Sequence, residues 1–197
     1  MLNTYHEEQI LVESWQIWIE PLVHKFGFHS STLLSLYQGT EIVFGTQERR
    51  YKILDEPSII TLTRVVLENY LTLFYLYFSK KSKEELIFRN NVWVYSGTKQ
   101  RTDFEVTTEY ANERKQAELS ALATYKKEIV ESPFFKQMGS SMQKGILDGI
   151  KPRLGITWKK LIDESYLRNS FFMNLYSFKS SYSHSEYLSV LQVKSNS

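Results

Sequence analysis

The sequence predicts an all-α protein: a helical bundle of six or seven helices around a buried apolar central helix. Three observations support this prediction. Apolar residues recur at three- and four-residue spacing along much of the chain, which is the period of an amphipathic helix. Residues that favour helix starts, namely serine, threonine, aspartate and proline, precede several of these segments. One stretch, residues 59–78, consists mainly of Ile, Leu, Val, Tyr and Phe, so we expect other helices to surround it.

The chain length favours one continuous core. It has 197 residues, of which 42% are hydrophobic, and such a chain can form a single domain. We therefore expect one helical domain over residues 1–197. Residues 1–56 would hold amino-terminal helices and an irregular linker, residues 57–192 the core bundle, and residues 193–197 a frayed tail.

The first helix is predicted at about residues 5–26, with a bend near Pro21 and an end at the glycine that follows. Its apolar positions, at helical spacing, are Leu11, Trp15, Trp18 and Leu22. A second, shorter helix with a serine cap is expected at residues 30–37. Residues 39–56 show the least regular pattern of this half, and we expect at most a turn of helix around 42–44.

The central apolar helix should begin at the residues Asp55, Pro57 and Ser58, which suit a helix start. It should end near Phe78, before a basic linker. It is long enough to cross a membrane. However, it contains Arg64, Glu68 and Asn69, and a central Arg or acidic residue costs roughly 2.5 to 3.5 kcal/mol on membrane insertion. We therefore interpret it as the buried helix of a soluble protein.

Further helices are expected in the carboxy-terminal half. One spans residues 84–96 before a glycine, and a longer, charged one spans 104–131 before a Ser-Pro pair. Residues 139–156 are rich in glycine and predict a short helix between two loops, a candidate mobile flap. A short helix from residue 157 to 161 and a final helix at about 166–191 complete the bundle.

Composition excludes several function classes. The chain has 24 Lys and Arg against 22 Asp and Glu, a net charge of +2, which is too small to bind a phosphate backbone strongly by charge alone. The absence of cysteine excludes disulfides, thiolate catalysis and Cys-ligated metals. The first ten residues lack the basic start of a secretory signal. These features predict a cytoplasmic protein without a membrane segment, a metal or another cofactor.

Two groups of polar residues could carry chemistry. Arg64 and Glu68 lie one helical turn apart on the apolar helix, and Tyr75 continues their face. They predict a buried polar strip that is either a core ion pair, which fixes helix register, or part of a binding site.

In the final helix, one face carries Tyr176, Ser180, Ser183 and Tyr187, with His184 beside it. Imidazole can act as a general acid or base near neutral pH, and a nearby cation could stabilise a phosphate. The alternative is a core-facing histidine held by a hydroxyl group or by Glu68.

The runs 63–70 and 176–185 resemble the bacterial family catalogued as domain of unknown function five-six-seven-seven. That family's pattern is an Arg and a Glu one turn apart on an apolar helix, followed by a Tyr, a Ser and a His at four-residue spacing. The matching positions here are Arg64, Glu68, Tyr176, Ser180 and His184. The resemblance covers roughly the last 145 residues.

This family is similar in outline to the HEPN helical bundles, some of which are metal-independent ribonucleases with an Arg, four to six residues, then a His. Here Lys179 stands four residues before His184. Lysine in place of arginine removes the bidentate fork that grips phosphate. The resemblance thus implies either a ribonuclease that uses His184 and Lys179 or a non-catalytic relative.

Taken together, these patterns predict one polar pocket formed by Arg64, Glu68, Tyr75, Tyr176, Ser180 and His184. We expect a non-catalytic binding or interaction module in bacterial stress or defence, with a metal-independent HEPN-like ribonuclease as the alternative. The expected partners are RNA or a nucleotide, a protein, or a second copy of the chain in a homodimer.

Overall fold

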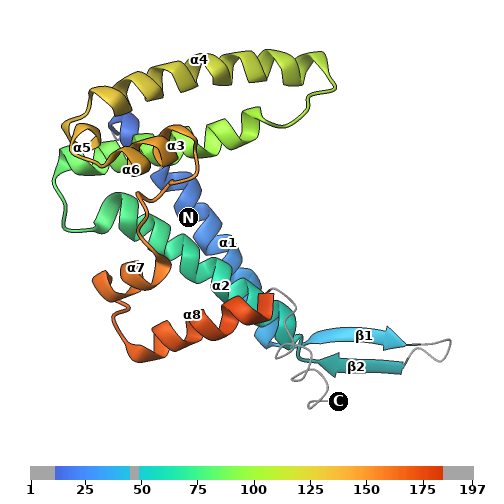
Figure 1. Ribbon diagram of the computed structural model, residues 1–197. Coiled ribbons are helices and arrows are strands. Elements are labelled where there is room, and N and C mark those ends of the chain that lie inside the picture. The colour runs from blue at the N-terminus through green and yellow to red at the C-terminus, as the bar shows by residue number, and fades with distance from the viewer. Residues whose placement is uncertain (1–11, 45–48, 184–197) are drawn as a thin grey trace. The chain divides into compact units, whose positions relative to one another are not determined.

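The computed structural model describes residues 12–44 and 49–183 of the chain (Figure 1). These residues form eight α-helices, a 3₁₀ turn, a π-helical turn and one hairpin, which confirms the all-α class. The helical elements are η2 (Ser14–Gln16), α1 (Ile19–Tyr37), α2 (Glu56–Leu73), η3 (Phe74–Phe78), α3 (Lys83–Thr102), α4 (Glu109–Glu131), α5 (Pro133–Lys136), α6 (Ser140–Leu147), α7 (Trp158–Glu164) and α8 (Ser170–Ser183). The strands are β1 (Thr40–Phe44) and β2 (Arg49–Ile53).

Contacts divide the described chain into two compact units. The first unit comprises the described residues up to Glu20 together with residues 80–155, and the second comprises residues 21–79 and 156–183. The prediction of a single domain over residues 1–197 stays a prediction.

The first unit is built on α3. This helix begins at Ser82, whose hydroxyl accepts a hydrogen bond from the Glu85 backbone N–H at 3.3 Å. It packs along α4, and α5 and α6 complete the unit (Figure 1). The buried core consists of Phe88, Val92, Tyr95, Ile129, Phe135 and Ile146. As the sequence predicts, α4 ends before Pro133, because Ser132 has extended backbone and cannot continue a helix into proline.

The second unit is built on α2, whose start and end agree with the sequence prediction. Asp55 accepts a hydrogen bond from the Ser58 backbone N–H at 3.1 Å, and Pro57 occupies the first turn. The helix continues through the π turn η3, where the Ser79 N–H donates to the Phe74 carbonyl at 2.8 Å. Helices α7 and α8 pack against α2.

The helix from Glu56 to Phe78 is long and apolar enough to cross a membrane by length and composition. Half of the most apolar 18-residue stretch of this helix is buried within the fold. The buried core helix of a globular domain meets the same two criteria.

The amino-terminal prediction is wrong in two respects. Where we expected a helix bent at Pro21 and a second helix from residue 30, α1 runs unbroken from Ile19 to Tyr37. Because α1 begins at Ile19, Pro21 lies in its first turn, where a missing N–H costs no hydrogen bond. Ser30 and Ser31, the expected caps of the second helix, lie inside α1 instead.

The expected helical turn at residues 42–44 is also wrong, since this segment is strand β1. It pairs with β2 in an antiparallel register that sets Ile42 opposite Tyr51 and Thr40 opposite Ile53. β-branched and aromatic residues favour a pleated strand over a helix. Gly39, at φ +86°, supplies the left-handed residue that turns the chain out of α1.

Smaller differences concern helix ends. Helix α3 continues past Gly97 to Thr102, because a glycine costs a helix interior only about 1 kcal/mol. Helix α6 is the short helix expected within residues 139–156, whereas α5 was not predicted. Helix α8 begins at Ser170, where the Asn169 side chain accepts a hydrogen bond from the Phe171 N–H at 2.8 Å.

Candidate functional site

The most polar contact of the second unit lies between α2 and α8. On α2, Nε of Arg64 lies 2.9 Å from Oε1 of Glu68, and the two residues are one helical turn apart. Their side chains are 20% and 28% exposed, so water reaches the pair only in part. The ion pair that the sequence predicts is therefore present and largely shielded.

Tyr176 of α8 joins this pair. Its hydroxyl donates to Oε1 of Glu68 at 3.4 Å, and Cζ of Arg64 lies 5.6 Å from the centroid of its ring. The second contact is a cation–π arrangement. One phenol from α8 thus contacts both charges of α2, and we call these three residues the Arg64–Glu68–Tyr176 cluster.

The cluster shifts two pKa values upward. The hydrogen bond to Glu68 raises the pKa of Arg64, which stays a cation at any physiological pH. Burial, followed by the negative charge of Glu68, raises the pKa of Tyr176. Near neutral pH the phenol is therefore a hydrogen-bond donor and not a base. The cluster can hold a polar group of a partner, but neither Arg64 nor Tyr176 can accept a proton there.

The other residues of the predicted pocket lie either in the core of the unit or among the side chains that the structure does not describe. Tyr75 lies in η3 and is fully buried, so it is part of the unit's core. Ser180 and Lys179 lie in the last turns of α8, but their side chains fall outside what the structure describes. His184 lies beyond the described residues. The predicted catalytic roles of His184 and Lys179 stay predictions.

One further contact of α2 was not indicated by the sequence. The buried Asn69 donates from Nδ2 to the Leu22 carbonyl of α1 at 3.3 Å. Burial also raises the pKa of its neighbour Tyr70. An asparagine in a mostly apolar helix was the available signal, since a buried amide needs a partner.

A second feature of this unit is the exposed apolar surface of α1 and the hairpin. Phe28 is 72% exposed and Leu34 is 68% exposed, whereas Leu22 is the only residue of α1 that is buried. The exposed apolar residues of this surface, which we call the α1–hairpin surface, are Val23, Phe28, Leu34, Tyr37, Val43, Tyr51, Ile53 and Leu54. Val23, Leu34 and Tyr37 lie within about 60° of one another around the helix.

No group of three or more His, Cys, Asp or Glu side chains that could hold a metal ion occurs among residues 12–44 and 49–183.

No protein-family model, curated protein or solved structure matches this chain.

Proposed function

We propose that this chain is a non-catalytic helical interaction module of the bacterial cytoplasm, and that it acts as a homodimer joined through strand β1. The observation that carries the proposal is the hairpin. Among the described residues, β1 and β2 pair only with each other, and both outer edges are unpaired (Figure 1). An isolated two-stranded sheet is marginal in water, and an open edge accepts another strand.

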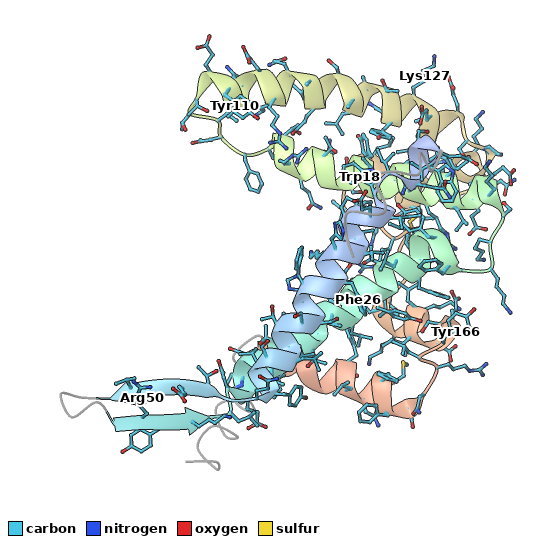
Figure 2. All side chains as sticks on the ribbon, turned by 180° about the vertical axis from the view of Figure 1, so that it is seen from behind. Trp18, Phe26, Arg50, Tyr110, Lys127 and Tyr166 are labelled. Atoms are coloured by element: carbon cyan, nitrogen blue, oxygen red, sulfur yellow. The ribbon has the colours of Figure 1, made fainter. Side chains whose placement is uncertain are left out.

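The charges of the two strands favour β1 as the contact. In an antiparallel dimer with twofold symmetry, a strand pairs with its own copy. The residue at the centre then faces itself, and every other residue faces the one that is equally far from the centre on the other side. A β2 pair centred on Arg50, Tyr51 or Lys52 always sets basic residues opposite one another (Figure 2 labels Arg50). A β1 pair centred on Ile42 sets Glu41 opposite Val43 instead and uses all five residues of the strand.

The resulting sheet would have four strands in the order β2–β1–β1–β2. On one face, a row across the four strands would hold Arg50 and Val43 of one copy, then Glu41 and Lys52 of the other, so each Glu41 would lie between a valine and a lysine. Within one chain, Glu41 already lies 3.9 Å from Arg50. The exposed Tyr51 and Ile53 of the two copies would then belong to one larger apolar sheet face.

The cluster described above agrees with a non-catalytic module. Glu68 pairs with Arg64 and accepts a hydrogen bond from Tyr176, so the charges of the cluster compensate one another. The raised pKa of Tyr176 keeps its proton in place near neutral pH. This arrangement favours a structural or binding role over proton transfer.

The absence of cysteine allows a direct test of the dimer. An Ile42→Cys variant would carry its thiol at the centre of the proposed strand pair, where Cα atoms of opposite residues lie about 4.5 to 5.5 Å apart. We expect mild oxidation to convert it to a covalent dimer, visible on a non-reducing gel. The matched control is Tyr51→Cys on β2, which should cross-link far less. A wild-type chain that is monomeric by light scattering, or equal cross-linking of both variants, would refute the proposal.

The second candidate is a metal-independent ribonuclease. What favours it is the packing of α8 on α2, which brings together Arg64, Glu68 and Tyr176, three of the residues that carry the family resemblance. In this proposal His184 acts as acid or base, and Lys179 or Arg64 holds phosphate. RNA would be incubated with the wild type and with His184→Ala in the presence of a chelator. Cleavage by the wild type alone supports the enzyme, and equal cleavage by both or by neither argues against it.

A further inference from the structure

The first unit contains a pocket that the sequence did not predict. It has a volume of about 420 Å³, within the range of small-molecule sites. Residues of α3 form most of its wall, together with Trp18 before α1 and Pro152 after α6. Its lining includes Trp18, Trp93, Ser96, Gly97 and Arg101.

We propose that this pocket binds a small planar aromatic or heteroaromatic molecule that carries an anionic group. The two indole rings would contact the flat ring, the Ser96 hydroxyl would form a hydrogen bond with it, and Arg101 would hold the anion.

The aromatic part of the site consists of two indole rings that contact each other. The rings of Trp18 and Trp93 meet edge to face, with centroids 6.3 Å apart and an interplanar angle of 75° (Figure 2 labels Trp18). The segment before Trp18 is anchored to α3, because Glu13 lies 2.7 Å from Nζ of Lys83 and also accepts a hydrogen bond from Trp15 at 3.0 Å. Two indoles at such an angle offer a ring face and a ring edge to a flat ligand.

Ser96 indicates where a polar ligand atom would lie. Its side chain is fully buried, and its Oγ has no hydrogen-bond partner among the residues that the structure describes. Two other buried hydroxyl residues, Ser79 and Thr102, donate to a nearby backbone carbonyl. An unpartnered buried hydroxyl is costly, so a ligand atom that pairs with it gains affinity.

Arg101 supplies the charge. Its Nε and Nη2 bind the two carboxylate oxygens of Glu118 at 3.0 and 2.6 Å, which fixes the guanidinium plane. A guanidinium has five N–H donors, so three remain for an anion. Arg114 lies 3.4 Å from the same carboxylate, so two cations share one acid and the local charge is positive.

Gly97 provides a way to close the pocket without disturbing the fold. A Cβ atom at this helical position would meet nothing within 4 Å. A Gly97→Leu variant should therefore fill the pocket and keep the helix. The matched control is Gly27→Leu, since Gly27 is also helical, has equally open surroundings, and does not line the pocket.

The test is a titration of the purified chain with two flat anions, adenosine 5′-monophosphate and indole-3-acetate, followed by calorimetry and tryptophan fluorescence. We expect saturable binding of at least one of them. Adenosine without phosphate should bind more weakly, and ribose 5-phosphate without the ring should not bind. Gly97→Leu should lower the affinity at least tenfold, and Gly27→Leu should leave it unchanged.

A Ser96→Ala variant tests the hydroxyl. We expect the affinity to fall about fivefold to tenfold. We also expect the ligand-free variant to melt at the same or a higher temperature, because an unpartnered hydroxyl has been removed. A lower melting temperature would show that Ser96 serves the fold and would overturn its assigned role. No saturable binding of either anion, equal binding of ribose 5-phosphate, or full affinity in Gly97→Leu would overturn the site.

Discussion

Tyr176 donates its hydroxyl hydrogen to Glu68 across 3.4 Å, although the two residues are 108 positions apart in the sequence. The same phenol ring faces the Arg64 guanidinium, so one side chain of α8 contacts both charged residues of α2. This relationship places a polar contact between α2 and α8. Substitutions at the cluster therefore test both the packing and the electrostatics of the second unit.

A Tyr176→Phe variant should keep the ring over Arg64 and lose only the hydrogen bond to Glu68. We expect the free energy of unfolding to fall by about 1 kcal/mol, measured by urea denaturation. The matched control is Tyr110→Phe on α4, where the side chain is exposed and the change should be close to zero (Figure 2). A Tyr176→Phe variant as stable as the wild type would show that this hydrogen bond contributes nothing to the fold.

Alkaline pH should destabilise the chain. The folded state raises the pKa of Tyr176, mainly by burial and then through Glu68, so it keeps this proton at pH values where the unfolded chain, with a pKa of about 10, loses it. Burial shifts Tyr70, Tyr95 and Tyr125 in the same direction. Stability is thus fully present below about pH 10 and decreases as the pH rises above it.

Urea midpoints measured between about pH 8 and pH 11 should record this decrease. Tyr176→Phe should flatten the curve, because the variant lacks one of the four phenols whose pKa is raised. Equal slopes for the wild type and Tyr176→Phe would contradict the assignment of the effect to Tyr176.

Local chemistry explains which features could be predicted from the sequence. Asp55 with Pro57 predicted the start of α2 because a cap depends on neighbours within one turn. Arg64 and Glu68 predicted their ion pair because helical spacing fixes the distance between them. Tyr176 was assigned to the same polar group from the family resemblance, and it does lie there.

Features that depend on distant segments could not be predicted. The hairpin was missed because its strands gain their pattern only from each other, and Ile42 to Phe44 alone also fits a helical turn. The pocket was missed because Trp18 and Trp93 both appeared as ordinary apolar positions of two separate helices. Neither periodicity nor composition could show that their rings meet.

Two glycines should respond in opposite ways to alanine. Gly39 has φ +86°, and a Cβ atom there would lie 3.0 Å from the Lys52 side chain, so Gly39→Ala should cost roughly 1 to 2 kcal/mol. Gly27 lies inside α1 with open space around it, so Gly27→Ala should stabilise the chain by roughly 0.5 to 1 kcal/mol. Thermal unfolding of the two variants measures both effects, and a shift of equal sign would contradict the backbone assignment at Gly39.

The Arg64–Glu68 pair can be assigned to the fold or to a binding site by a double-mutant cycle. Each single variant, Arg64→Met or Glu68→Met, leaves one partly shielded charge without its main partner, so we expect each to lose about 1 to 2 kcal/mol of stability. The double variant removes both charges and should recover most of that loss, which gives a coupling energy of about 2 kcal/mol by urea denaturation.

A coupling of this size identifies the pair as a contact that holds α2 in register, because the two side chains then stabilise the fold only together. Additive losses would mean that the charges act independently, and the cluster would then be better placed to bind a partner through Arg64. The same double-mutant cycle should also be measured in a Tyr176→Phe protein, to show whether the pair depends on the phenol. If the phenol orders the pair, the coupling between Arg64 and Glu68 should decrease when its hydroxyl is removed, whereas a pair set by helical spacing alone should keep its coupling.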